Sequence, residues 1–289
     1  MNVTMPTMTR SLLLGLAAGL ALTLLTAAAA ALTDAATAAA LPVILALAAI
    51  VTLMHHWKTQ LFGSLREDFR QVGQRLTRLD EQVRETQGLV QLTPYEHPYP
   101  MPFGGGWALT ADAAALLARE IALNAPNTLV ELGSGVSSVL IGRMLKQAGR
   151  GRLISLDHDP HWAEQTRRHI RASGLEDYVE VLDAPLARQR FGQEEYQWYQ
   201  MPERLRQAGE IDMLIIDGPP AALDPKGMPR YPALPAFQPL LSERAVIYVD
   251  DAARPQEQAM IERWQREYPG YTRTMYDTVP GTCVLRRKG

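Results

Sequence analysis

The run Thr128-Leu129-Val130-Glu131-Leu132-Gly133-Ser134-Gly135-Val136-Ser137-Ser138 joins three kinds of local pattern within eleven residues. An apolar segment carrying one acid, Glu131, breaks at two glycines, and apolar residues at helical spacing follow from Val139 to Leu145. We expect a buried strand, a tight turn and a helix, because such a turn needs glycine where the backbone is unusual or a ligand comes close. The unpaired N–H groups at the helix start favour a nucleotide-like ligand.

Composition limits the function classes before any motif is considered. The chain has 289 residues, a formal net charge of -2 and a single cysteine, Cys283. A nearly neutral charge balance gives no electrostatic reason to expect a nucleic-acid partner. One cysteine excludes a disulfide within the chain and is compatible with a reducing compartment.

The N-terminal region, residues 1–57, is rich in alanine and leucine and contains two apolar runs. Ser11 to Leu32 carries no charge and is long enough to cross a hydrocarbon core of roughly 30 Å. A second run, Ala35 to Met54, follows after a short break, and together the two predict a membrane hairpin of two transmembrane helices. The basic residues flank the pair and not the loop between them, so both ends are expected on the cytoplasmic side of the membrane.

Two other interpretations of residues 1–57 compete with the hairpin. Arg10, the apolar core and the alanines before Leu32 also suit a cleaved signal peptide. The second apolar run argues against that interpretation. Two buried helices of a soluble domain are disfavoured because neither run has a polar face.

Residues 58–92 predict a helical stalk. Their apolar residues alternate at spacings of four and three, as in a heptad repeat, with Thr86 in one position: Leu65, Phe69, Val72, Leu76, Leu79, Val83 and Val90. A parallel dimeric coiled coil is one interpretation. A single amphipathic helix lying on the catalytic domain or on the membrane is the other, and Gly73 weakens the case for a long coil.

Residues 93–106 contain four prolines and end in three glycines, which excludes a helix or a central strand. The simplest interpretation is a linker. Its aromatic residues, with Trp107 just beyond, suggest instead a loop that packs onto the following domain near a pocket mouth.

From residue 107 to the end, apolar strands alternate with helical patterns, which predicts a parallel sheet with helices on both faces. The expected strands are 128–132, 152–157, 179–182, 211–217, 245–251, 271–276 and 282–286, with helices near 112–124, 160–170 and 255–268. In such sheets the ligand lies at the carboxyl ends of the strands. That edge collects Gly133, Gly135, Asp157, Asp183, Asp217, Asp250 and Asp251.

The acids narrow the choice of nucleotide. A dinucleotide-binding loop has a third glycine where Ser138 stands, so the match to that fingerprint is imperfect. Asp157, at the end of the next strand, suits both hydroxyls of a ribose. A pyrophosphate is disfavoured beside so many carboxylates, whereas a ligand with an adenosine, an amine and a sulfonium cation is favoured.

Four motifs in order resemble one family: Val130–Gly135, Ser155–Pro160, Asp217–Pro220 and Val249–Asp251. They resemble class I S-adenosylmethionine-dependent methyltransferases, and most closely the branch of catechol and caffeoyl-CoA O-methyltransferases. The resemblance extends over residues 107–288 and implies a Rossmann-like seven-stranded sheet whose last strand is antiparallel.

The resemblance also implies a cofactor site. Gly133 and Gly135 would admit the methionine part, Asp157 would bind the ribose, and His158 would lie beside the adenine. The alternative for Glu131 is that it only orients the loop, and for Asp183 that it only caps a turn. The full implied set is Glu131, Gly133, Ser134, Gly135, Asp157, His158, Asp183 and Ala184.

Metal-dependent members of the branch hold a divalent ion through an acid after the fourth strand and an Asp-Asn pair after the fifth. Asp217 and Asp250 match two of these ligands and are the expected catalytic residues, while Asp251 stands in place of the asparagine. Such oxygen ligands suit Mg²⁺. Without a metal, a general base is needed, and Asp217, His97 and His158 are candidates.

Two segments after strands, 189–206 and 218–239, are expected to shape the acceptor pocket, where Lys226 and Arg230 either meet an anionic substrate or are solvated. The expected function is a membrane-anchored methyltransferase using S-adenosylmethionine, at the cytoplasmic face of the membrane. Its acceptor would be a small or membrane-associated molecule methylated on oxygen, and the stalk would support a homodimer. An NAD(P)-dependent oxidoreductase and a non-catalytic membrane scaffold are the alternatives.

Overall fold

The computed structural model describes residues 19, 23, 35–95, 109–223 and 227–288. The chain divides into two units, residues 1–78 and 79–289. His97 and Lys226, and all but residues 93–95 of the predicted 93–106 linker, lie outside the described residues.

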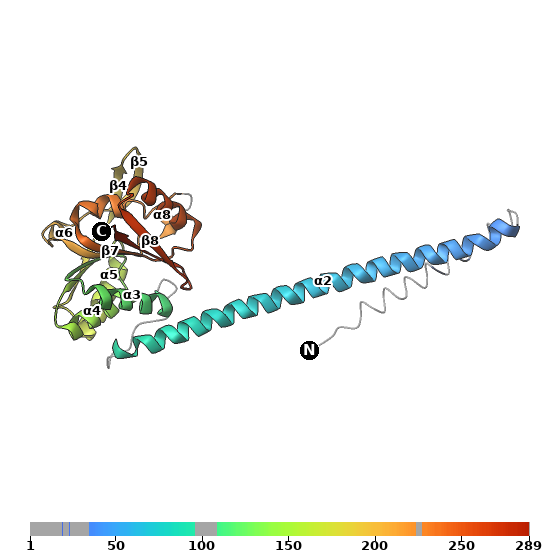
Figure 1. Ribbon diagram of the computed structural model, residues 1–289, viewed down its shortest axis with the longest axis horizontal. Coiled ribbons are helices and arrows are strands. Elements are labelled where there is room, and N and C mark those ends of the chain that lie inside the picture. The colour runs from blue at the N-terminus through green and yellow to red at the C-terminus, as the bar shows by residue number, and fades with distance from the viewer. Residues whose placement is uncertain (1–18, 20–22, 24–34, 96–108, 224–226, 289) are drawn as a thin grey trace. The chain divides into compact units, whose positions relative to one another are not determined.

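One helix, α2 (Ala35–Leu92), runs for 58 residues and contains Pro42 (Figure 1). It continues without a break through the boundary predicted between membrane segment and stalk at residue 57, and through Gly73. Its stretch from Pro42 onward is the one helix of the described residues that is long and apolar enough to cross a membrane. The first predicted span, 11–32, is described only at Gly19 and Thr23, so the structure supports one candidate span and not the hairpin.

The seven-stranded sheet has the order β3-β2-β1-β6-β7-β9-β8. The first five of these strands are parallel, and β9 is antiparallel to both β7 and β8. The antiparallel last strand confirms the expectation. The strands are β1 (Thr128–Leu132), β2 (Arg152–Asp157), β3 (Val179–Asp183), β6 (Ile211–Ile216), β7 (Leu241–Val249), β8 (Tyr271–Tyr276) and β9 (Thr282–Arg287).

Helices cover both faces of this sheet, as predicted. Successive side chains of a strand point to opposite faces of the sheet. Accordingly, Leu129 of β1 packs into one apolar cluster and Val130 into the other. The first cluster contains apolar residues of α3 (Ala111–Asn124), α4 (Val136–Ala148) and α5 (Pro160–Ala172). The second contains those of α7 (Ala233–Phe237) and α8 (Pro255–Glu267).

The chain extends the sheet from β1 through β2 to β3 and then returns to place β6 on the other side of β1. Ligands of open α/β sheets bind where the strand order reverses in this way. The registers bring the strand ends level, with Leu132 opposite Leu156 on one side and opposite Ile216 on the other. The residues that follow β1, β2 and β6 are therefore neighbours at one edge.

A second, two-stranded sheet was not predicted. It consists of β4 (Leu186–Phe191) and β5 (Glu194–Tyr199), which pair antiparallel around Gly192. Both strands are rich in charged residues and glutamine, so their apolar alternation is short. Trp198 and Tyr199 of β5 are nevertheless completely buried in the cluster beneath α8.

The remaining elements are short. They are the helix α6 (Glu203–Arg206) and the 3-10 turns η1 (Thr93–Tyr95), η2 (Ala221–Leu223) and η3 (Gln238–Leu240).

The end of α2 belongs to the second unit, where it packs against the start of α3. A Cβ atom at Gly88 would lie 2.4 Å from the backbone carbonyl carbon of Ala111, so only glycine permits this approach. The Glu85 carboxylate accepts the N–H of Ala111 at 3.0 Å, and Leu92 is buried in the cluster that contains α3.

Candidate active site

The loop between β1 and α4 lies at the reversal point of the sheet. Gly133 has a φ of 97°, a conformation that strains any other residue, and its N–H donates to Leu156 O at 2.8 Å. A Cβ at Gly133 would lie 3.3 Å from the nitrogen of Gly218. Gly135 differs: its φ of 167° is ordinary extended backbone, and no described atom lies within 4 Å of a Cβ placed there.

Because the two glycines differ in this way, alanine variants can separate effects on folding stability from effects on ligand binding. We expect Gly133→Ala to lower the free energy of unfolding by about 1 kcal/mol or more, because its backbone is left-handed. Gly135→Ala should change it by less than about 0.5 kcal/mol, yet weaken cofactor binding roughly tenfold, since the methyl group enters open space beside the loop. Urea unfolding and calorimetry measure the two effects. Unchanged cofactor affinity in Gly135→Ala would place the ligand elsewhere.

Asp157, at the end of β2, holds the glycine loop from the neighbouring strand. Its side chain is buried, and Oδ2 accepts the backbone N–H of Ser134 at 3.1 Å and the Ser134 hydroxyl at 2.6 Å. Oδ1 accepts the N–H of Asp159 at 3.0 Å, and the His158 Nδ1 lies 3.6 Å away. The structure thus brings Ser134, Asp157 and His158 together, as the sequence predicted.

Glu131 lies fully buried beneath the same loop. Its Oε2 accepts the hydroxyls of Ser155, at 2.6 Å, and of Ser138, whose oxygen in turn accepts the N–H of Gly135 at 3.1 Å. Ser138 thus connects the loop backbone to Glu131 in the position where a dinucleotide-binding loop has glycine. Burial raises the pKa of Glu131 to about 7, although the serine hydroxyls oppose the shift.

Asp183 ends β3 and Ala184 follows it, at the same edge. The backbone N–H of Ala184 donates to Asp157 O at 2.7 Å, which places Ala184 next to the end of β2. The Asp183 carboxylate is paired with Arg167 of α5 at 2.8 Å and is largely exposed. The ion pair with Arg167 therefore supports the alternative interpretation, in which Asp183 has only a structural role.

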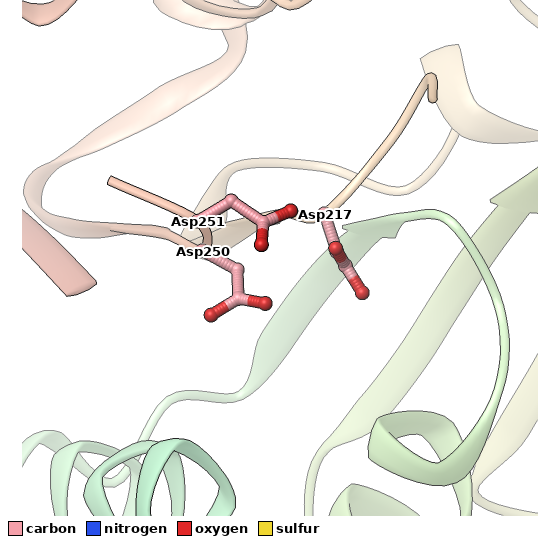
Figure 2. Close-up of side chains that lie close together, drawn as sticks. All are labelled: Asp217, Asp250 and Asp251. Atoms are coloured by element: carbon pink, nitrogen blue, oxygen red, sulfur yellow. The ribbon is translucent and has the colours of Figure 1, made fainter. Parts of the chain in front are cut away.

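Asp217, after β6, and Asp250 and Asp251, after β7, form an acid cluster (Figure 2). One carboxylate oxygen from each lies within 4.8 Å of the others. Their convergence confirms that the strand ends bring these acids together. Burial raises the pKa of Asp217 to about 6, and burial together with the neighbouring carboxylates raises the pKa of Asp250 well above its ordinary value.

Arg230 also lies in this cluster, and that position was not predicted from the sequence. Its side chain is only 3% exposed, and Nη2 lies 3.0 Å from Asp251 Oδ2 and 3.4 Å from Asp217 Oδ1. The expectation that Arg230 meets an anionic substrate or is solvated is wrong, because carboxylates and carbonyls of the protein already surround it. Although burial opposes its charge, the carboxylates keep the pKa of Arg230 above its ordinary value.

The acid cluster does not fit a three-carboxylate Mg²⁺ site. The oxygen spacing suits a divalent ion, and Asp250 Oδ1 is buried with no hydrogen-bond partner among the described residues. However, Asp251 Oδ2 already pairs with Arg230 at 3.0 Å and with Arg254 Nη1 at 2.6 Å. Mg²⁺ requires a nearly ideal octahedron of oxygens and would be repelled by guanidinium groups at the same carboxylates.

Tyr199 also lies in the site. From the sequence it was expected only as part of the segment 189–206, which was expected to shape the acceptor pocket. It is completely buried, and its hydroxyl has no hydrogen-bond partner among the described residues. A Cβ at Gly218 would lie 2.2 Å from that hydroxyl, so the oxygen sits beside the chain that follows Asp217. Its ring meets that of His158 edge-on at 6.5 Å. Only the short alternation of Tyr196 and Trp198 preceding it signals that this strand is buried.

A family model described as "Methyltransferase domain" matches residues 130–252, from the glycine loop to the acid cluster. Residues 130–252 are a methyltransferase domain. These residues belong to the seven-stranded sheet, which β8 and the antiparallel β9 complete beyond residue 252. Among curated proteins, none matches this chain.

Several solved methyltransferase structures share similarity at low identity. The O-methyltransferase from Bacillus cereus in complex with SAH is 17% identical, with 71% of this chain and 91% of that chain covered and a TM-score of 0.48. The SAH-bound Podospora anserina methyltransferase PaMTH1 is 16% identical, with 70% and 88% covered and a TM-score of 0.48. The O-methyltransferase TomG from Streptomyces achromogenes, in complex with SAM, is 17% identical, with 71% and 90% covered and a TM-score of 0.45. The identification of the methyltransferase domain rests on the family match.

Proposed function

We propose that the methyltransferase domain uses S-adenosylmethionine and methylates an oxygen of a small or membrane-associated acceptor. The observation that carries this proposal is the buried Asp157 carboxylate, held against the glycine loop at the reversal point of the sheet. A carboxylate in that place accepts hydrogen bonds from ribose hydroxyls. The open space at Gly135 leaves room for the rest of the cofactor.

When bound, the cofactor would supply an electrophilic methyl group on a sulfonium, with the neutral thioether as the leaving group. The protein then has to align the acceptor and remove its proton, so positioning dominates catalysis. We propose that Asp217 is the general base that removes the proton of the acceptor. It is the most exposed of the three clustered acids, with 25% of its side chain accessible. Its raised pKa of about 6 suits a general base near neutral pH. Asp250, next to it, is proposed to orient the acceptor.

Binding calorimetry on the detergent-solubilised full chain tests the proposal directly. We expect S-adenosylhomocysteine to bind and NAD⁺ not to bind, because Ser138 fills the position of the third glycine and is bonded to Glu131. Binding of NAD⁺ alone would favour the oxidoreductase alternative. Transfer of labelled methyl groups from S-adenosylmethionine to a membrane extract distinguishes an enzyme from a non-catalytic scaffold.

We also propose that the first part of α2 anchors the enzyme in the cytoplasmic membrane, with the methyltransferase domain in the cytoplasm. Most of its large apolar side chains between Val43 and Met54 are exposed, and Trp57 and Lys58 follow in the order typical of a membrane interface. We expect the full chain to stay in the membrane pellet after a carbonate wash and a variant lacking residues 1–57 to become soluble. Recovery of the full chain in the soluble fraction would contradict the anchor.

We also propose that α2 forms a parallel homodimer, and the exposure of its last turns supports this. One side of these turns contacts the rest of the second unit and contains Arg84, Glu85, Gly88 and Leu92. The heptad positions Leu79, Val83, Thr86 and Val90 are exposed. At about 100° per residue these two sets lie on opposite sides of the helix. In a parallel pair, Arg75 of one copy would face Asp80 of the other, which adds an attractive charge pair.

Cross-linking tests this dimer, because Cys283 is buried and leaves no competing exposed thiol among the described residues. Mild oxidation should convert Val83→Cys to a disulfide-linked dimer in high yield. Glu81→Cys, on the side away from the heptad positions, is the matched control and should stay monomeric on a denaturing gel. Equal yields from both variants would rule out the proposed register.

A further inference from the structure

The acid cluster already contains a cation that belongs to the chain. Arg230 donates from Nε to Pro219 O at 3.2 Å, from Nη1 to Asp250 O at 3.2 Å, and from Nη2 to Asp217 O. These backbone carbonyls follow the two strands that carry the clustered acids. The planar guanidinium is therefore held by main-chain carbonyls. Any other conformation of the side chain would break several buried hydrogen bonds.

The same guanidinium contacts the carboxylates on which a divalent ion would depend. Nη2 lies 3.0 Å from Asp251 Oδ2 and 3.4 Å from Asp217 Oδ1, and Nε is 4.0 Å from Glu257 Oε1. Arg254 adds a second positive charge at Asp251 Oδ2. A divalent cation at these oxygens would have to compete with one buried guanidinium and one half-exposed guanidinium.

We propose that Arg230 serves as a built-in cation in place of a divalent metal, so that this methyltransferase works without one. Arg230 acts as a positioning residue: it holds the segments after β6 and β7 together and offsets the charge of Asp217 and Asp251. The carboxylates of Asp217 and Asp250 then remain beside the acceptor without an ion to anchor them. The inference rests on the proposed function only where it concerns turnover.

Titration of the full chain with Mn²⁺, followed by electron paramagnetic resonance, tests the inference without any activity assay. The wild-type protein should leave Mn²⁺ free up to millimolar concentrations, and chelator should not reduce methyl transfer to a membrane extract. Arg230→Gln removes the guanidinium and should tighten Mn²⁺ binding at least roughly tenfold. Arg244→Gln is the control, because Arg244 is exposed, pairs with Asp212 and should leave Mn²⁺ binding unchanged.

Binding of one equivalent of Mn²⁺ to the wild-type protein at micromolar affinity, lost in Asp250→Asn, would overturn the inference. If Arg230→Gln does not fold, the wild-type titration still decides, and Arg230→Lys gives a second variant that keeps the charge. S-adenosylhomocysteine calorimetry keeps the two proposals apart. Failure to bind that ligand contradicts the proposed function, whereas Mn²⁺ binding contradicts only the inference about Arg230.

Discussion

Replacing Asp157 by alanine should weaken the binding of S-adenosylhomocysteine by roughly 100-fold or more. The variant loses a buried carboxylate that would accept two ribose hydroxyls, and hydrogen bonds to a charged group contribute about 1.5–3 kcal/mol each. It also loses the acceptor for Ser134, so the glycine loop is less well held. Calorimetry on the detergent-solubilised full chain measures the effect.

Ser134→Ala separates the two contributions to this loss. It removes the hydroxyl that donates to Asp157 at 2.6 Å but keeps the carboxylate and the backbone N–H contact at 3.1 Å. We expect its affinity to fall by less than roughly fivefold. If Ser134→Ala and Asp157→Ala weaken binding equally, Asp157 acts only by holding the loop. If Asp157→Ala binds as tightly as the wild type, the assignment of the ribose site is wrong.

Replacing Glu131 by glutamine should make the protein's stability less dependent on pH. Burial raises the pKa of Glu131 from 4.5 to about 7, so the folded protein favours the protonated acid more than the unfolded chain does. The resulting stabilisation is fully present below pH 4.5 and is lost as pH rises through 7. Its full size is about 3 kcal/mol.

The glutamine variant has no proton to lose at this position. Its free energy of unfolding, relative to that of the wild type, should therefore rise by about 3 kcal/mol between pH 4.5 and pH 7.5. Urea unfolding followed by tryptophan fluorescence measures the difference, because Trp198 and Trp264 are completely buried in the folded domain. Parallel stability curves for the two proteins over this range would show that Glu131 is ionised in the folded state.

The sheet and most of the site could be predicted because they depend on local patterns. Five apolar runs interrupted by helices can form a parallel sheet, and parallel strands end at one edge. The glycine loop, Asp157 and the three clustered acids therefore come together whatever the details of packing. Glu131 was also expected to support the loop, and its contacts with Ser138 and Ser155 show how it does so.

Other features could not be predicted from local patterns. The change in composition near residue 57 suggested a boundary, but α2 continues because no helix-breaking residue stands there. The β4–β5 sheet was missed because its charged strands carry only a brief apolar alternation, and its burial depends on the cluster beneath α8. Tyr199 enters the site only through that packing.

The sequence by itself determined the α/β architecture, the glycine loop and the strand-end acids, since these follow from periodicity and chain direction. Only the tertiary structure decided what neutralises those acids. Arg230 lies in a proline-rich segment after β6, and nothing in local spacing shows whether its long side chain reaches solvent, substrate or protein. It is placed by carbonyls of Asp217, Pro219 and Asp250, which become neighbours only when β6 and β7 pair.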